Sequence, residues 1–250
     1  NDPEVSRKIE EEATKFAENV QRAAEQLGKI LEERIQKDVK PALANIPSFL
    51  EHLPFVGNVL FGSTITTEEE YAGELTGDEI EVCYTGRNGF LEIKPWDVPA
   101  YRLEVKKTVQ GPKAEELKNV KAFDVSNESG RLELRVKSEI IAGVNGTLWL
   151  PRDKSYSLRL HTSNGWMRIQ GLKGNRLQAQ TSNGRVEIRG WTGEQVGART
   201  SNGSIECTDV IGNEVELETS NGRISASMSA KKSLCRTSNG PINLKLHVAS

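Results

Sequence analysis

The tetrapeptide TSNG occupies residues 162–165 and returns at 181, 200, 219 and 237. The intervals of 19, 19, 19 and 18 residues are too regular for chance and too short for separate domains. Within each unit apolar residues alternate with Arg, Glu, Gln, Ser and Asn, and the same apolar positions recur in the next unit. A period of two inside a unit and about 19 between units predicts short strands repeated once per coil.

A unit of this length has no room for a helix, a returning strand and two turns. It fits one rung of a β-solenoid, with one corner at SNG and a second near Gly171–Gly174 or Gly190–Gly193. Successive rungs would pair at about 4.8 Å, so that equivalent inward residues stack into columns. We therefore expect a mainly β fold, a solenoid of about 19-residue rungs over residues 66–250.

The corner itself is expected to be a structural ladder. Asn-Gly suits positive φ, which turns the chain sharply, and stacked asparagine amides can bond from rung to rung. Less regular coils are expected upstream, at Gly89, Gly130 and Gly146. The predicted ladder contains Asn145, Asn164, Asn183, Asn202, Asn221 and Asn239.

Two further segments precede the solenoid. Residues 1–40 are predicted to form a long amphipathic helix, because Asp2-Pro3 is a good helix start and apolar residues follow at steps of three and four. Residues 41–65 are apolar and broken by Pro and Gly, which predicts a connector or a plug for the open end of a solenoid. A membrane anchor lying in the interface and a contact with a neighbouring subunit are the alternatives for this segment.

An interaction patch is expected where outward tryptophans meet the helix. By strand parity Trp149 and Trp166 point outward from neighbouring rungs, and paired exposed indoles mark a contact. We expect the helix stripe of Phe16, Val20 and Leu27 to dock there, from the same or a neighbouring copy. A stacking platform for a glycan and scattered exposed aromatics are the alternatives.

Composition excludes several classes of function. A net charge of −2 gives no general attraction to nucleic acid, and no stretch of 18 apolar residues would span a bilayer as a helix. The three cysteines match no metal or disulfide pattern. Outward Glu and Arg alternate on a solvated face, and His161 has no second ligand or base beside it, so we expect no enzyme activity, metal site or cofactor. The first residue is Asn1 rather than Met, so either a leader has been cleaved, which would favour export, or the residues before it are left out of the sequence.

The stretch LPRDKSYSLRLHTSNGWMRI followed by TSNG repeats resembles bacterial "putative adhesin" repeat domains, which are envelope-associated β-helical proteins without an assigned general function. The resemblance covers about residues 75–250. It implies a single-stranded right-handed β-helix and, in some members, a role in the cell envelope. It supplies no catalytic residues, and the N-terminal helix lies outside it.

Two functions follow as hypotheses. The first is a structural cell-envelope protein that forms homo-oligomers or filaments head to tail, in which the N-terminal segment of one copy covers the uncapped C-terminal rung of another. The second is an adhesin-like module that presents a solenoid face to a glycan, peptide or lipid ligand in the envelope stress response. We expect an extracellular or cell-surface location, with a cytoplasmic one as the alternative. The expected capping and assembly contacts are Phe49, Leu53, Phe55, Val59, Phe61, Leu244, Leu246 and Val248.

Overall fold

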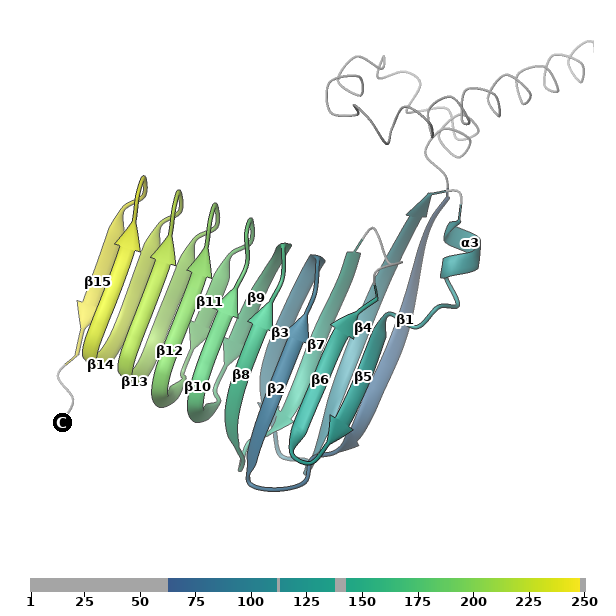
Figure 1. The fold of residues 1–250 in the computed structure, drawn as a ribbon, viewed down its shortest axis with the longest axis horizontal. Coiled ribbons are helices and arrows are strands. Elements are labelled where there is room, and N and C mark those ends of the chain that lie inside the picture. Colours follow the sequence, from purple (N-terminus) through teal and green to yellow (C-terminus); the bar gives the residue numbers. More distant parts are fainter. Residues whose placement is uncertain (1–62, 112, 138–142, 248–250) are drawn as a thin grey trace, which may run out of the picture. The chain divides into compact units, whose positions relative to one another are not determined.

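The computed structural model describes residues 63–111, 113–137 and 143–247. The helix predicted for residues 1–40 and nearly all of the 41–65 connector lie outside these ranges. Most of the described residues belong to one compact unit, which contains residues 65–109 and those from 116 onward. The unit is built almost wholly from strands (Figure 1).

Two layers of strands face each other across the core. The first layer runs, in spatial order, through β1 (Ser63–Glu74), β4 (Ala100–Gly111), β7 (Gly143–Pro151), β3 (Asn88–Trp96), β9 (Asn164–Gln170) and β11 (Val186–Arg189). The second runs through β5 (Phe123–Glu128), β6 (Arg131–Val136), β2 (Glu79–Thr85), β8 (Ser155–His161), β10 (Lys173–Gln180) and β12 (Thr192–Thr200).

The layers join at one end through long strands that contribute a segment to each. These strands are β13 (Ile205–Thr219) and β14 (Ile224–Thr237), and the last strand of the first layer is β15 (Ile242–Leu246). The short helix α3 (Ala114–Leu117) follows β4. Strands from β8 to β15 pair only in parallel, as expected for stacked rungs, so the prediction of a mainly β, solenoid-like fold is confirmed for this part of the chain.

The register reproduces the predicted columns. Leu177 pairs with Leu158 on one side and Val196 on the other, and Val196 in turn pairs with Val215. These four side chains are 0–2% exposed. The column then reaches Ser233, which pairs with Val215 after the register between β13 and β14 has shifted by one residue between Cys207 and Val210. As far as Val215 this column is thus a stack of aliphatic side chains, each supported by its equivalents one rung away.

The upstream coils follow a different path from the one expected. Strands β2 and β3 lie between β6 and β7 on one side and β8 and β9 on the other, although β4 to β7 intervene in the sequence. β4 runs antiparallel to β7, and β5 antiparallel to β6. Gly130 is therefore not a coil corner: Ser129 and Gly130 have φ of 51° and 77°, as in the two-residue turn of a β-hairpin.

Candidate functional site

The TSNG corners are built by close backbone stacking, which corrects the positive-φ explanation. Positive φ occurs at Gly171 and Gly190, in the opposite corners, but not at the glycines of the TSNG motif. A Cβ on Gly184 would lie 1.7 Å from the carbonyl oxygen of Gly165, and one on Gly203 would lie 1.8 Å from that of Gly184. Glycine is required here because one rung's backbone rests on the next.

Each motif threonine fastens its rung to the one before. The buried Thr200 hydroxyl donates to the carbonyl of Gly184 at 3.0 Å and accepts from the amide of Gly203 at 3.2 Å. Thr181 and Thr219 repeat this arrangement. A hydroxyl that satisfies two buried backbone groups at a corner explains why the motif begins with Thr.

The asparagines form the ladder, with one correction. Side-chain amides bond from rung to rung at 2.6–2.9 Å through Asn88, Asn164, Asn183, Asn202, Asn221 and Asn239. Asn145 does not lie in this ladder: its neighbour Gly146 pairs with Leu91, which puts Asn145 two residues out of register with Asn88. The position predicted for Asn145 is taken by Asn88, because β3 lies between β7 and β9.

The two predicted patch tryptophans are not neighbours. Trp149 lies on β7 and Trp166 on β9, with β3 between them. Trp166 stacks on Phe90 with ring centroids 4.1 Å apart, and the Arg168 guanidinium lies 4.9 Å from the Trp166 ring centroid. Trp149 packs against Trp96 at 6.2 Å instead. Both indoles are partly exposed. Their expected partners Phe16, Val20 and Leu27 lie outside the described residues, so helix docking stays a prediction.

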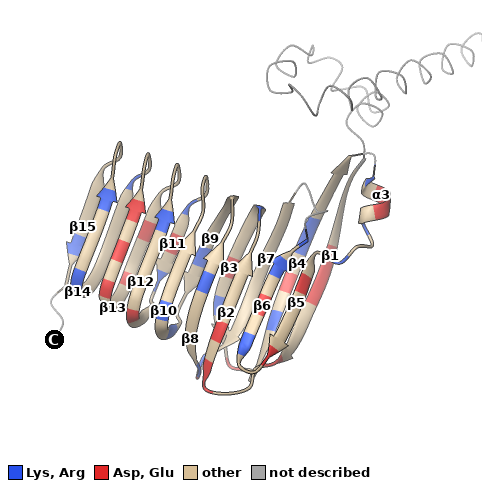
Figure 2. Ribbon diagram, in the orientation of Figure 1, with Lys and Arg blue, Asp and Glu red and all other residues tan. Residues whose placement is uncertain are grey.

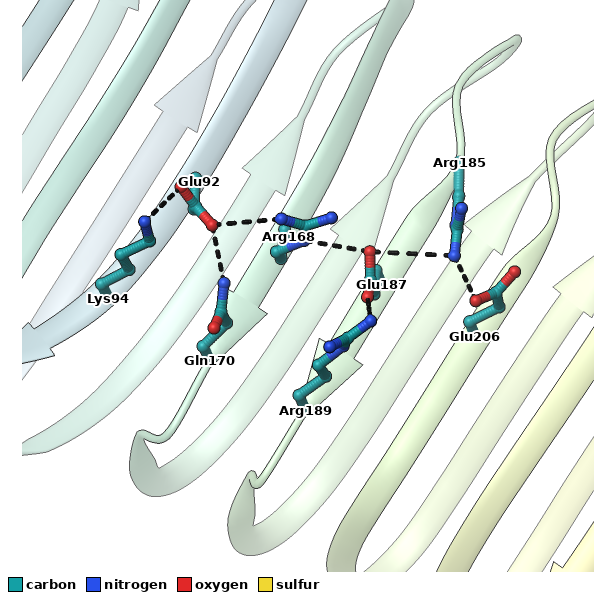
Figure 3. Close-up of polar contacts among 8 residues, drawn as sticks. All are labelled: Glu92, Lys94, Arg168, Gln170, Arg185, Glu187, Arg189 and Glu206. Carbon is teal, nitrogen blue, oxygen red and sulfur yellow. Dashed lines mark hydrogen bonds and ion pairs between the residues drawn. The ribbon is translucent and has the colours of Figure 1, made fainter.

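A charged network crosses the outer face of β3, β9, β11 and β13 (Figure 3). Glu187 sits at its centre and pairs with Arg168 at 3.0 Å and with Arg185 and Arg189. Arg168 continues to Glu92 at 3.4 Å, and Gln170 donates to the same carboxylate at 2.6 Å. The outward parity of Glu187 was foreseen, but the face is not simply solvated: Glu187 is 1% exposed and Glu92 7%.

This network sets the protonation of Glu187. Burial alone would raise the pKa of the carboxyl, but the hydrogen bond and charge of Arg168, together with Arg189 and Arg185, outweigh burial and lower it. Because the folded-state pKa lies below the unfolded one, Glu187 stabilises the fold at pH above about 4.5, and this contribution is lost as the pH falls through the folded value.

Replacing Glu187 with glutamine is therefore expected to lower the free energy of unfolding by about 2 kcal/mol at pH 7. The same substitution should shrink the loss of stability between pH 7 and pH 3. Urea unfolding at the two pH values measures both effects. Glu216→Gln is the matched control, since Glu216 pairs with Arg199 on a half-exposed site and should matter little. Equal effects of the two substitutions would contradict the central role of Glu187.

A second buried charge pair binds the segment after α3. Lys107, fully buried on β4, lies 2.8 Å from Glu69 of β1 and donates to the carbonyls of Leu117, Lys118 and Val120. The Glu69 carboxylate also accepts the amide of Ala122 at 2.9 Å. Burial would raise the pKa of Glu69, but these bonds lower it. The Lys107 ammonium and the Glu69 carboxylate thus bind each other and the backbone of residues 117–122, so the cluster is structural.

The end of the unit at β15, opposite to the end formed by β1 and β5, is not covered by any other described element. Leu244 and Leu246 occupy inward columns, opposite Ala226 and Met228, yet are 44% and 59% exposed. Ile242, stacked on Ile224, is 40% exposed, and sequence reasoning did not single it out for assembly. Among the described residues β15 pairs with β14 alone, so its outer edge is unpaired. The other proposed contacts, Phe49, Leu53, Phe55, Val59, Phe61 and Val248, lie outside the described residues.

Comparison with known proteins identifies the family. The profile of the family described as Toastrack DUF4097 matches residues 77–249. The chain belongs to this family. The matched residues of this Toastrack domain include all of the parallel rungs from β8 to β15. No curated protein matches the chain.

Solved structures with similar folds are distant. A "putative cell adhesion protein" from Clostridium sporogenes is 13% identical, with a TM-score of 0.48 over 73% of this chain and 100% of the other. A "putative adhesin" from Bacteroides fragilis is 12% identical, with a TM-score of 0.40 over 72% and 97%. A "putative lipid binding protein" from Parabacteroides distasonis is 14% identical, with a TM-score of 0.31 over 72% and 95%.

Two classes of feature are absent from the described part of this Toastrack domain. Within residues 63–111, 113–137 and 143–247, no three or more His, Cys, Asp or Glu side chains gather as they would around a metal ion. No helix in these ranges combines the length and apolar character needed to cross a membrane.

Proposed function

We propose that this Toastrack domain is a non-enzymatic structural module that self-assembles through its open end. The observation that carries the proposal is the exposed column of Ile242, Leu244 and Leu246 beside the unpaired edge of β15. An open rung offers apolar side chains and free backbone hydrogen-bonding groups together, and such an edge pairs readily with another strand. A contact of this kind, between an end and a different surface of the next copy, leads to filaments.

An extracellular or cell-surface location, with a cytoplasmic one as the alternative, belongs to the same proposal. It rests on the resemblance of the TSNG repeats to envelope-associated repeat domains. Fractionation of cells that produce the full-length protein tests it.

The assembly proposal predicts that Leu244→Asp combined with Leu246→Asp abolishes association of the 250-residue chain. Both side chains are exposed in the single chain, so the change should leave the β-sheet circular dichroism intact while placing carboxylates in the contact. Sedimentation velocity over a range of concentrations measures the result. Asn243→Ser is the control, since Asn243 lies between the two leucines on the opposite face of β15. A wild-type chain that stays monomeric throughout contradicts the proposal.

A ligand-binding module is the second candidate. It is favoured by the partly exposed Phe90–Trp166 stack, which borders a hollow of about 410 Å³ lined by Asn164, Asn183 and Arg185. An aromatic face beside the amide and guanidinium groups of Asn164, Asn183 and Arg185 suits a glycan better than a lipid, because a sugar can stack on the ring and bond to these groups. A ligand-binding module does not require self-association, so the sedimentation experiment also separates the two candidates.

A further inference from the structure

Charge is segregated between the edge strands at the two ends of the unit (Figure 2). At one end, β1 carries four glutamates and β5 carries Asp124 and Glu128, and neither strand has a basic residue. Three of these side chains pair with cations beyond the two strands: Glu69 with Lys107, Glu70 with Arg102 and Asp124 with Lys137. The end therefore relies for its acidic character on Glu68, Glu74 and Glu128. At the other end, β14 carries Lys231, Lys232 and Arg236 and β15 carries Lys245, and neither has an acidic residue. The sequence contains no Asp or Glu after Glu218. We call these the acidic end and the basic end.

Along one outward column of the last rungs, charges alternate from one rung to the next. Glu218 lies between Arg199, at 2.8 Å, and Arg236, at 4.0 Å. Lys232 pairs in the same way with Glu214 of the preceding rung, at 3.2 Å. Arg236 and Lys232 belong to the last segment of the second layer, so they have acidic neighbours on one side only. A following strand that continued the alternation would be acidic.

The acidic end offers such strands in both layers. β1 is the outermost strand of the first layer, and β5 is the outermost strand of the second. At the basic end the corresponding edges are β15 in the first layer and the last segment of β14 in the second. The partly exposed Tyr71 and Val125 add apolar surface to the acidic end. The two ends therefore have their outer strands in the same two layers, carry opposite charges and both expose apolar side chains.

From this match we infer that the occupant of the basic end is the acidic end of a second copy of this chain, with β15 beside β1 and β14 beside β5. The inference rests on the proposed self-assembly and gives it a direction. Pairing of two basic ends would bring like charges together, which opposes association. Each head-to-tail contact leaves one basic and one acidic end free, so assembly continues instead of closing as a dimer.

Charge reversal at the basic end tests the direction. Lys232→Glu, Arg236→Glu and Lys245→Glu in one chain should weaken association at least about tenfold, because acidic residues would then face the acidic end. Wild-type association should also weaken as salt rises from about 0.05 to 0.5 M, since the paired charges lie at the rim. Sedimentation velocity of the 250-residue chain measures both, with circular dichroism to verify folding.

Reversal at the acidic end supplies the matched experiment. Glu68→Lys, Glu74→Lys and Glu128→Lys should weaken association to a similar degree. A chain with both ends reversed should recover it, because the ends are complementary again. Recovery excludes misfolding as the cause of the single-end losses.

The outcomes separate the inference from the proposal on which it rests. Mixing the two single-end variants should restore long species, since their native ends complement each other and so do their reversed ends, whereas each variant alone should associate poorly. If wild-type chains associate and reversal of the acidic end has no effect, the head-to-tail inference is wrong while self-assembly stands. If wild-type chains do not associate at any concentration or salt, both are wrong.

Discussion

Gly203→Ala is expected to lower the free energy of unfolding by more than about 3 kcal/mol. The new Cβ would lie 1.8 Å from the carbonyl oxygen and 2.4 Å from the carbonyl carbon of Gly184. Both are backbone atoms, so relief requires two rungs to separate at the corner. Separation would also stretch the bonds of the Thr200 hydroxyl to both glycines. Urea unfolding followed by far-ultraviolet circular dichroism measures the loss.

Gly197→Ala is the matched control for this prediction. Gly197 lies in β12, six residues before Gly203 in the sequence, and a Cβ there would meet its nearest atoms at 3.8 Å, an ordinary contact. Its φ is not in the positive region. We expect a change within about 0.5 kcal/mol. If Gly203→Ala were equally mild, the corner backbones would not be stacked as closely as described.

The corner also shows what the sequence could and could not foretell. A repeat of 19 residues predicts parallel rungs in register, because only equivalent residues then stack, and the column from Leu158 to Val215 follows directly. The presence of glycine predicts a constraint on the backbone but does not say which one. Positive φ and close approach both exclude a side chain, and only the coordinates distinguish them.

The path of the chain through the first rungs was beyond sequence reasoning. Asn164 bonds to Asn88, which lies 76 residues earlier, while the nearer Asn145 is out of register. The strands from β4 to β7 form an excursion whose place beyond β2 and β3 is set by tertiary packing, not by any local periodicity. The separation of Trp149 from Trp166 follows from the same excursion.

Parity predicted the direction of side chains better than their exposure. Glu187 points away from the core as expected, yet three longer arginine side chains cover it: Arg168 from the neighbouring strand β9, and Arg185 and Arg189 from two residues before and after it in the sequence. The charge difference between the ends was legible in the sequence, as a run without acidic residues after Glu218. This charge difference suggests a contact between copies only once β1 and β5 are known to be the edge strands at the other end.

The effect of an Asp substitution on stability should differ most sharply between an inward and an outward position that are adjacent on one strand. Leu177, on β10, is 0% exposed and lies in the middle of a column, whereas Gln178 is exposed on the outer face. Leu177→Asp would remove a buried leucine and bury a carboxylate between Leu158 and Val196, where no cation is available to pair with it. Losing the leucine alone costs about 2–5 kcal/mol, and burial of the unpaired charge adds several more.

Because small domains are stable by only about 5–15 kcal/mol, Leu177→Asp is expected to prevent folding at pH 7. Gln178→Asp introduces the same carboxylate one residue later, in water, and should change the free energy of unfolding by less than about 1 kcal/mol. Circular dichroism and urea unfolding of the two variants give the comparison. Raised acidity should partly rescue Leu177→Asp alone, since a protonated carboxyl is less costly to bury than a carboxylate. Folding of both variants with similar stability would mean that the columns do not form the core.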